Sequence, residues 1–505
     1  MKITRRTALL AASSAAIARP ALAEKSTDTL RIQFVDAVPN VDMYFNSQRT
    51  GLILAHQAWD MLVHRDPSSF DIKPSLATDW KFVDASTLDL TIRQGVKFHD
   101  GSAMGPDDVV YTLNMAADPA SKVATPSNYN WIAKAEKTGD WTVRIHMKRP
   151  TPAALEYLAM VTPIHPKAYR EKVGPEGFAK APIGAGPYRI AKNVQGQEIV
   201  FERFADYWAG SPKGKPAIKT LHVRFVPDLA TEVTNLLAKQ VDWIWNINPD
   251  QMKQINQMPH LQAVQQESMR IGYLSIDAAG RTGKDNPLTK LKVRQAMAHA
   301  INRKDLIEAE SGFGTPIGSH FPPHNKAYID LTGTYPFDIA KGKALLAEAG
   351  YPNGFDASLK LPPVGYAQRA GEVLASQLGK IGIKVAITQL QWPQWLSEVF
   401  KEHNYDLTVV AHTEANDLDR YARDGYYWNY NSPAFKAKWR EVVEATDFTK
   451  RDELLKECQR IIARDAVNGF LYQLAKIGVW KKELVGMWEN SPTPSVDLTG
   501  VHWKA

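Results

Sequence analysis

Segments with strand-like alternation and segments with helix-like amphipathicity follow one another along almost the whole chain. Leu88, Leu90 and Ile92 occupy every second position, which is typical of a half-buried strand. Pro106 and the acidic pair that follows it suit the first turn of a helix, where a missing N–H costs nothing and negative charge faces the positive helix end. Strands are predicted at residues 30–35, 87–92, 141–147, 199–204, 221–226, 241–247, 272–276, 384–387, 406–410, 470–474 and 478–480, and helices at 52–62, 106–113, 230–239, 292–301, 338–349, 370–381 and 451–463.

This alternation contains no internal repeat and no low-complexity tract. Strands that alternate with helices are typical of an α/β protein, in which helices cover a sheet. The 505 residues exceed what a single hydrophobic core usually holds. We therefore expect two or three domains of the α/β class.

The first residues have the three parts of a secretory signal. Lys2, Arg5 and Arg6 form a basic start, residues 8–18 are uncharged and rich in alanine and leucine, and an Ala-Leu-Ala triplet ends at Ala23. This pattern predicts a signal peptide over residues 1–23 and cleavage after Ala23. Its adjacent arginines also fit a twin-arginine signal, but we expect the Sec route. No later segment has the roughly 18 apolar residues of a membrane span, so we expect a periplasmic protein.

Charge and cysteine content exclude several classes of partner. The chain has 61 Lys and Arg against 54 Asp and Glu, and four of the cations leave with the predicted signal, so the mature charge is 57 − 54 = +3. That balance argues against nucleic acid or an anionic membrane surface as a partner. A single cysteine, Cys458, allows no intrachain disulfide.

Seven groups of residues form a recognisable series along the chain. Leu76-Ala77-Thr78-Asp79-Trp80 precedes a strand that ends in a Val-Lys-Phe-His-Asp-Gly turn at Gly101. The groups are residues 76–80, 88–101, 183–188, 207–208 with 239–242, 293–296 with 300–303, 340–355, and 378–385. Together they resemble the signature of family 5 extracellular solute-binding proteins, the peptide- and nickel-binding proteins of bacterial ABC importers. Most of these residues are expected to be scaffold, since they place turns and helix ends.

The resemblance implies a two-lobed periplasmic binding protein fold, type II-like and of cluster C, with an extra inserted subdomain. Two crossings between the lobes would form a hinge that closes on a ligand. The implied boundaries are lobe I at 24–55, 183–271 and 481–505, the inserted subdomain at 56–182, and lobe II at 272–480.

The resemblance also implies where a ligand would bind. In peptide-binding members of the family, an aspartate in the loop after a Tyr-Asp-Leu strand pairs with the α-ammonium of the ligand. Here that strand contains Asp406, and Asn416 takes the position of the aspartate. The neighbouring acids of this loop, Glu414, Asp417 and Asp419, could hold a cation, and His412 opens the same loop.

Further ligand contacts are expected from four other segments next to the predicted cleft. They would offer the ligand backbone groups, aromatic side chains, or a cation for a ligand carboxylate. They are Asp36, Ala37 and Val38 after the first strand, Tyr129 and Trp131, Trp245 and Asn246 near the hinge, and Tyr366 and Arg369 in lobe II.

These features predict a periplasmic substrate-binding component of an ABC importer that captures a small peptide or peptide-like solute. No Gly-x-Ser-x-Gly or His-Glu-x-x-His motif is present, so we expect no enzyme activity, no cofactor and no resident metal. The expected partners are the ligand and an inner-membrane permease, and we expect a monomer. The same scaffold could instead bind an opine, a sugar or a nickel or other metal chelate, with His412 as a ligand, or act as a sensor or chaperone.

Overall fold

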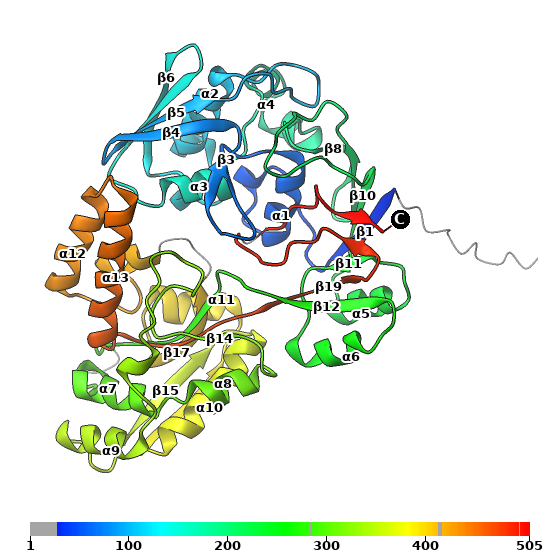
Figure 1. The fold of residues 1–505 in the computed structure, drawn as a ribbon. Coiled ribbons are helices and arrows are strands. Elements are labelled where there is room, and N and C mark those ends of the chain that lie inside the picture. The colour runs from blue at the N-terminus through cyan, green and yellow to red at the C-terminus, as the bar shows by residue number, and fades with distance from the viewer. Residues whose placement is uncertain (1–27, 282–284, 413–416, 494, 505) are drawn as a thin grey trace, which may run out of the picture.

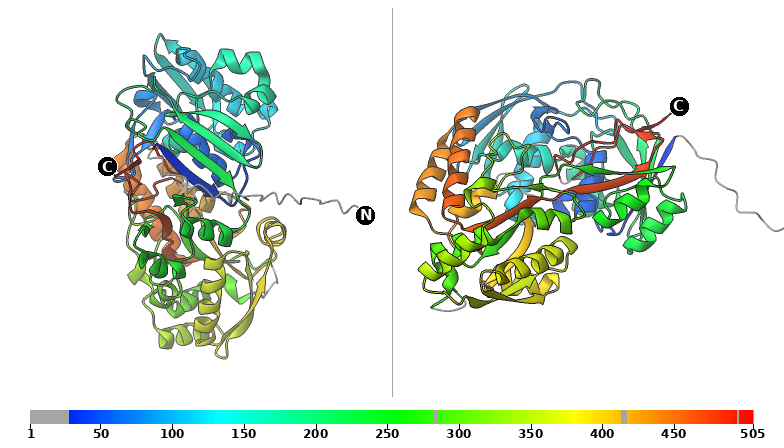
Figure 2. Two further views of the ribbon diagram at one scale, coloured as in Figure 1. Left: turned by 90° about the vertical axis from the view of Figure 1, so that its right-hand side faces the viewer. Right: turned by 60° about the horizontal axis from the view of Figure 1, so that its bottom comes forward.

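Two lobes lie one above the other, joined at one side, in the computed structural model, which describes residues 28–281, 285–412, 417–493 and 495–504 (Figures 1 and 2). The upper lobe of Figure 1 contains the N-terminal strand, the segments near residues 60–250 and the C-terminal segment. The lower lobe contains the green, yellow and orange segments between about residues 271 and 473. This mixed α/β architecture confirms the predicted fold class.

A seven-stranded sheet forms the base of the upper lobe, which we call lobe I. Its first strand β1 pairs in parallel with both β10 and β11, so segments about 200 residues apart in sequence lie side by side. In spatial order the strands are β12 (Leu261–Gln266), β19 (Lys476–Lys481), β11 (Trp243–Ile244), β1 (Thr29–Phe34), β10 (Thr220–Phe225), β9 (Glu198–Arg203) and β8 (Tyr188–Val194). The helices of this lobe are α1 (Arg49–Ala58), α5 (Leu229–Leu237) and α6 (Met252–Asn256).

A four-stranded antiparallel sheet with its own buried core forms the top of the upper lobe. Its strands, in spatial order, are β4 (Ala77–Asp84), β5 (Thr87–Ile92), β7 (Thr142–Met147) and β6 (Ile132–Gly139). Helices α2 (Pro106–Ala117), α3 (Ala154–Met160) and α4 (Lys167–Lys180) accompany it, with the short ribbon of β2 (Val63–Arg65) and β3 (Ile72–Pro74). Helix α2 starts at Pro106 as predicted, and the Asp108 carboxylate accepts a hydrogen bond from the Gly105 N–H at 2.8 Å.

A six-stranded mixed sheet organises the lower lobe, which we call lobe II. Its strands, in spatial order, are β14 (Thr315–Pro316), β18 (Asn468–Gln473), β13 (Ile271–Ile276), β17 (Leu407–His412), β15 (Phe355–Leu361) and β16 (Ile383–Gln389). Its helices are α7 (Leu291–Ala300), α8 (Arg303–Ala309), α9 (Ile339–Glu348), α10 (Gly365–Gly379), α11 (Trp392–Trp395), α12 (Pro433–Glu444) and α13 (Phe448–Arg464). The C-terminal ribbon of β20 (Leu484–Val485) and β21 (His502–Trp503) belongs to lobe I.

The strands that the sequence missed include β4, β6, β8 and β12, whose burial is irregular or largely exposed, and β15, whose burial does alternate. The predicted helix at residues 52–62 instead begins at Arg49 and ends at Ala58. At its end, Gly184 and Gly186 pack on the backbone of Ala58. A Cβ on Gly186 would come within 2.5 Å of the Ala58 carbonyl carbon, so this motif glycine is required by close packing and not only by a turn.

The second crossing between the lobes lies earlier than the sequence suggests. Strand β19 begins at Lys476 and pairs with β12 and β11 of lobe I, while β18 ends at Gln473 in lobe II. The chain therefore crosses at Leu474 and Ala475, and residues 476–480 lie in the lobe I sheet. Both faces of β19 are buried there. The remaining domain boundaries stay a proposal.

The lobes also contact each other away from the crossings. The Lys326 ammonium pairs with the Asp71 carboxylate at 2.6 Å, and the ring of Phe70 stacks on His324 with 3.7 Å between centroids. Phe82 of β4 meets Phe448 of α13 at 5.9 Å. These contacts join the subdomain to lobe II, as the orange helices of Figure 1 reaching toward β4 show.

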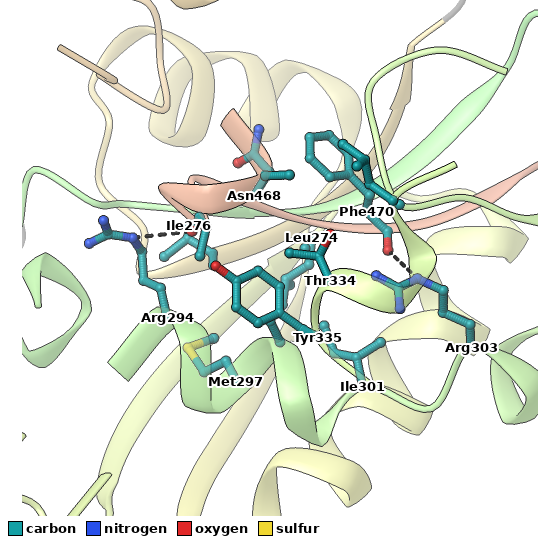
Figure 3. Close-up of a pocket in the computed structure, with 16 residues that line it drawn as sticks. Leu274, Ile276, Arg294, Met297, Ile301, Arg303, Thr334, Tyr335, Asn468 and Phe470 are labelled. Carbon is teal, nitrogen blue, oxygen red and sulfur yellow. Dashed lines mark hydrogen bonds between the residues drawn. The ribbon is translucent and has the colours of Figure 1, made fainter. Parts of the chain in front are cut away.

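Two motif arginines have scaffold roles inside lobe II (Figure 3). The Arg294 Nε donates to the Ala466 carbonyl at 3.1 Å, and the Arg303 Nε donates to the Phe470 carbonyl at 2.9 Å. They flank a narrow pocket between α7 and the sheet. Because these guanidinium groups donate to backbone carbonyls inside lobe II, they support the fold.

Candidate functional site

The two crossings form a paired hinge. The hydroxyl of Ser268 in the first crossing donates to the Leu474 carbonyl at 2.6 Å in the second. The Leu474 N–H in turn donates to the Arg270 carbonyl at 2.8 Å. Because these two hydrogen bonds link the crossings side by side, rotation of the lobes bends both segments together.

A cavity of about 640 Å³ opens at this hinge. Its walls come from both crossings, from the first residue of α1, from the end of β11 and from the C-terminal segment. The lining residues are Arg49, Trp245, Asn246, Ser268, Met269, Arg270, Lys476, Ser491 and Thr493. Three are cationic and none is acidic, which suits an anionic group.

Lys476 is the most unusual member of this cavity. Its side chain is buried, its ammonium donates to the Gln266 Oε1 at 2.6 Å, and it lies 3.5 Å from the centre of the Trp245 ring. Burial, together with the nearby Arg49 guanidinium, holds the pKa of Lys476 well below its usual value. The ammonium is therefore held where positive charge is disfavoured.

A second cavity, of about 1150 Å³, extends from the first along the space between the lobes and shares Arg49 with it. Lobe I, the subdomain and lobe II all line it, and Arg420 and Arg423 contribute from lobe II. A third cavity, of about 990 Å³, shares these two arginines and Tyr157 with the second. Since neighbouring cavities share lining residues, the three lie next to one another between the lobes, and an interlobe cleft of this kind buries most of a small ligand.

The sequence predicted two residues of the hinge cavity. Trp245 and Asn246 follow β11 and line it, and the Asn246 side-chain oxygen accepts from the Ile477 N–H at 3.1 Å. The Asn246 amide thereby fixes the start of β19. Trp245 presents its ring to Lys476, and so an aromatic wall and a cation share this cavity.

Tyr129 lines the second cavity and Trp131 the third, while their contact with a ligand stays a prediction. Both side chains are nevertheless almost fully buried. The Tyr129 hydroxyl donates to the Val161 carbonyl at 2.7 Å, and the Trp131 indole donates to the Asn128 carbonyl at 2.8 Å. Their polar groups are thus occupied within the protein, and their rings are almost entirely covered by it.

Tyr366 and Arg369 lie on α10. The Tyr366 hydroxyl accepts from the Ala411 N–H at 3.0 Å, and its ring lies 5.3 Å from the Arg270 guanidinium. Arg369 forms a two-pronged ion pair with the buried Glu310, at 3.0 and 2.6 Å. The structure therefore gives Arg369 a carboxylate within the protein.

The loop after β17 is described only in part. His412 ends β17 and packs against the rings of Tyr273 and Trp428, with 5.2 and 5.9 Å between centroids. Glu414 and Asn416 lie outside the described residues, and Asp417 begins the short helix η8 (Asp417–Ala422). Farther along this helix, Asp419 lines the third cavity and pairs with Arg423.

Asp36, Ala37 and Val38 follow β1 at its carboxyl end. Asp36 and Ala37 are exposed, while the Val38 side chain packs into the lobe I core. Burial first, and then the charge of Asp36, raises the pKa of Glu232 on α5 to about 8. The backbone contacts predicted for this segment remain a prediction.

Sequence analysis missed the cations of the cleft, namely Arg49, Arg149, Arg270, Arg420, Arg423 and Lys476. Lys476 did leave a signal, because it is the only charged residue between Phe470 and Trp480 in an otherwise apolar, strand-like run. Arg270 lies at the predicted domain crossing. A charge inside a buried strand is rare without a function or a partner.

Other chemistry can be assessed for the described residues. Among residues 28–281, 285–412, 417–493 and 495–504, no group of three His, Cys, Asp or Glu side chains is placed to hold a metal ion. Burial raises the pKa of Cys458 to about 12, which makes its thiol a poor nucleophile. In the same part of the chain, no helix has both the length and the apolar character needed to span a bilayer.

Comparison with known proteins gives consistent relatives. The chain is 28% identical over 451 residues to heme-binding protein A of Haemophilus influenzae, covering 82% of this chain and 81% of that protein. It is 31% identical over 426 residues to the glutathione-binding protein GsiB of Salmonella typhi, covering 80% and 81%. It is 28% identical over 446 residues to the dipeptide-binding protein of Escherichia coli, covering 80% and 81%.

Solved structures agree with the two-lobed fold. HbpA2 from Haemophilus parasuis superposes with a TM-score of 0.81 at 24% identity, covering 94% of this chain and all of that one. AgaA from A. tumefacien R10, solved with agropinic acid, has a TM-score of 0.73 at 26% identity, covering 94% and 99%. The sequence model of the family described as bacterial extracellular solute-binding proteins, family 5, matches residues 71–436 of this chain. The chain therefore belongs to family 5 of the bacterial extracellular solute-binding proteins, and it has a substrate-binding role in import.

Proposed function

We propose that this protein captures a small peptide or a peptide-like solute between its two lobes and delivers it to the permease of an ABC importer. The observation that carries the proposal is the row of cavities in the interlobe cleft, whose hinge end combines Trp245 with Arg270 and Lys476. A peptide-like solute offers a carboxylate for the cations and an apolar part for the aromatic wall.

The relatives support this ligand class. GsiB is a glutathione-binding protein and the Escherichia coli relative is a dipeptide-binding protein. AgaA holds agropinic acid in its crystal structure. A peptide-like solute such as an opine therefore belongs within the same proposal, since the cations of this cleft suit its acidic groups.

The remaining parts of the proposal concern the setting of the protein. It acts in the periplasm after removal of residues 1–23, works as a monomer, and binds its solute without turning it over. A hinged binding protein reports its ligand by shape, because closing the lobes creates a surface that the open form lacks.

Thermal-shift screening tests the ligand class. The purified mature protein is mixed with a panel of di- and tripeptides, opines and metal chelates, and a ligand at 100 times its Kd should stabilise it by about 2.7 kcal/mol. X-ray scattering with and without that ligand should show a smaller radius of gyration when it is bound. A panel in which only metal chelates raise the melting temperature would reject the peptide proposal.

A tryptophan readout places the ligand in the cleft. Ligand binding should shift the tryptophan fluorescence emission of the wild type. Trp245→Phe should lose part of that shift, because a ligand in the hinge cavity excludes water from the Trp245 ring. Trp439→Phe on α12 is the matched control, since it lines the far end of the cleft. Equal loss in both variants would place the ligand away from the hinge.

A further inference from the structure

Each of the two hinge crossings places a cation in the same cavity, without a carboxylate partner. Lys476 begins β19 immediately after the second crossing, and Arg270 ends the first crossing just before β13. Among the residues that the structure describes, no Asp or Glu forms an ion pair with either of them. Their neighbours are instead a glutamine oxygen and a tyrosine ring.

Such an arrangement is costly in the empty protein. A buried ammonium loses its hydration, and the hydrogen bond from Lys476 to a neutral amide oxygen replaces only part of it. Arg49 lines the same cavity and adds repulsion to Lys476. Proteins that retain an unpaired buried cation usually use it, and a ligand anion is the partner that this cavity has room to admit.

Lys481 provides a comparison within the same strand. It is five residues farther along β19, its side chain is equally buried, and its ammonium pairs with the Asp242 carboxylate at 2.5 Å. Arg31 also reaches that carboxylate, at 2.7 Å. The fold therefore does supply a carboxylate to a buried lysine of this strand where the lysine is structural, and it supplies none to Lys476.

We infer that the hinge cavity is a carboxylate-binding subsite, and that the transported solute is an anionic, peptide-like molecule whose carboxylate is held jointly by Lys476 and Arg270. This inference rests on the proposed function and names its substrate class. The apolar part next to the carboxylate packs on Trp245, which lines the same cavity.

The position of the subsite connects ligand charge to lobe closure. A carboxylate held by Lys476 and Arg270 links the two crossings, and each crossing continues into a different lobe sheet. Bending the hinge moves the two cations relative to each other, so an anion held by both favours one hinge angle. A ligand that binds one hinge angle more tightly than another shifts the equilibrium between open and closed lobes toward the angle it prefers.

Replacing Lys476 by methionine tests the inference with two readouts of opposite direction. Lys476→Met keeps the volume of the side chain and removes the charge, so the ligand-free melting temperature should rise by about 2 °C or more. Affinity for an anionic ligand should fall at least about 30-fold, the usual cost of removing one partner of a buried charge pair. A purely structural lysine would give a lower melting temperature.

Lys481→Met is the matched control. The same substitution on the same strand removes one of the two cations that hold the buried Asp242 carboxylate and leaves it with Arg31 alone, so the melting temperature should fall. Arg270→Gln is the second binding variant, and because its side chain is half-buried it should fold even if Lys476→Met does not. Affinity for an anionic ligand should again drop about tenfold or more.

The probes separate this inference from the proposed function. Glutarate, a simple dicarboxylate, should raise the melting temperature of the wild type beyond an ionic-strength control, and should fail to do so in Lys476→Met and Arg270→Gln. Calorimetry with Ala-Glu and its amide analogue Ala-Gln then tests the substrate class, with Ala-Glu bound more tightly. If peptides bind but both variants keep wild-type affinity, the carboxylate subsite is wrong and the proposed function stands. If glutarate stabilises only the wild type and no peptide-like solute binds, the subsite stands and the peptide proposal fails.

Discussion

The ion pair between Arg369 and Glu310 offers a direct test of whether a predicted ligand residue is a scaffold residue. The guanidinium meets the carboxylate through two bonds, at 3.0 and 2.6 Å. The Glu310 side chain is 4% exposed and that of Arg369 is 35% exposed. The buried negative charge of Glu310 is therefore compensated by Arg369, whereas the Arg369 guanidinium keeps contact with solvent.

Arg369→Gln should leave the Glu310 carboxylate buried without a cation. Removing one partner of a fully buried pair costs about 3–5 kcal/mol, and the solvent contact of Arg369 reduces this to about 2–3 kcal/mol. The double variant Glu310→Gln with Arg369→Gln removes both charges and should lie within about 1 kcal/mol of the wild type. With the single variant Glu310→Gln added, urea unfolding followed by circular dichroism gives the four free energies of unfolding of the double-mutant cycle, with an expected coupling of about 2 kcal/mol.

An exposed pair calibrates the measurement. Lys292 and Glu348 are 2.9 Å apart, but their side chains are 54% and 49% exposed. Lys292→Gln should therefore cost less than about 1 kcal/mol. If Arg369→Gln is equally mild and the double variant binds the ligand more than tenfold more weakly, Arg369 serves the ligand and the scaffold interpretation is refuted.

Three further predictions concern the framework around the cleft. Because burial raises the pKa of Glu232 to about 8, the stability that this group contributes is full below pH 4.5 and is lost as the pH rises through 8. In urea unfolding, the free energy of unfolding of Glu232→Gln should equal that of the wild type at pH 5 and exceed it at pH 8.5. If the substitution leaves the pH dependence of stability unchanged, Glu232 is not its source. Asp242→Ala should cost about 3–5 kcal/mol in the same assay, since Lys481 is left buried without its carboxylate, and a loss below 1 kcal/mol would contradict that. Gly186→Ala should lower the melting temperature by several degrees in calorimetry, because a Cβ collides with backbone; a normal melting temperature would show that the backbone there can shift.

Local signals in the sequence identified much of the fold. Pro106 starts α2 as its position predicts, and Gly101 adopts a φ of 86° in the turn before it. Strand β5 has the predicted limits, since every second side chain is buried. These elements follow from short-range sterics and from the spacing of apolar residues, and both are written in adjacent positions.

The site was only partly accessible from sequence. Trp245 and Asn246 were predicted because they follow a strand near the expected crossing, and both line the hinge cavity. Arg369 was expected to face a ligand, and the structure pairs it with Glu310, 59 residues away. No local pattern in either segment indicates that partner, because ion pairs depend on distances that only the folded chain defines.

The sequence by itself determined the class of the fold, the family and most element positions, because backbone geometry and hydrophobic spacing act over a few residues. The tertiary structure alone decided that Arg270 and Lys476, 206 residues apart, meet in one cavity without a carboxylate. Whether a charge is solvated, paired or waiting for a ligand is a property of its surroundings, and electrostatic energy depends on burial and separation that the linear order of residues does not contain.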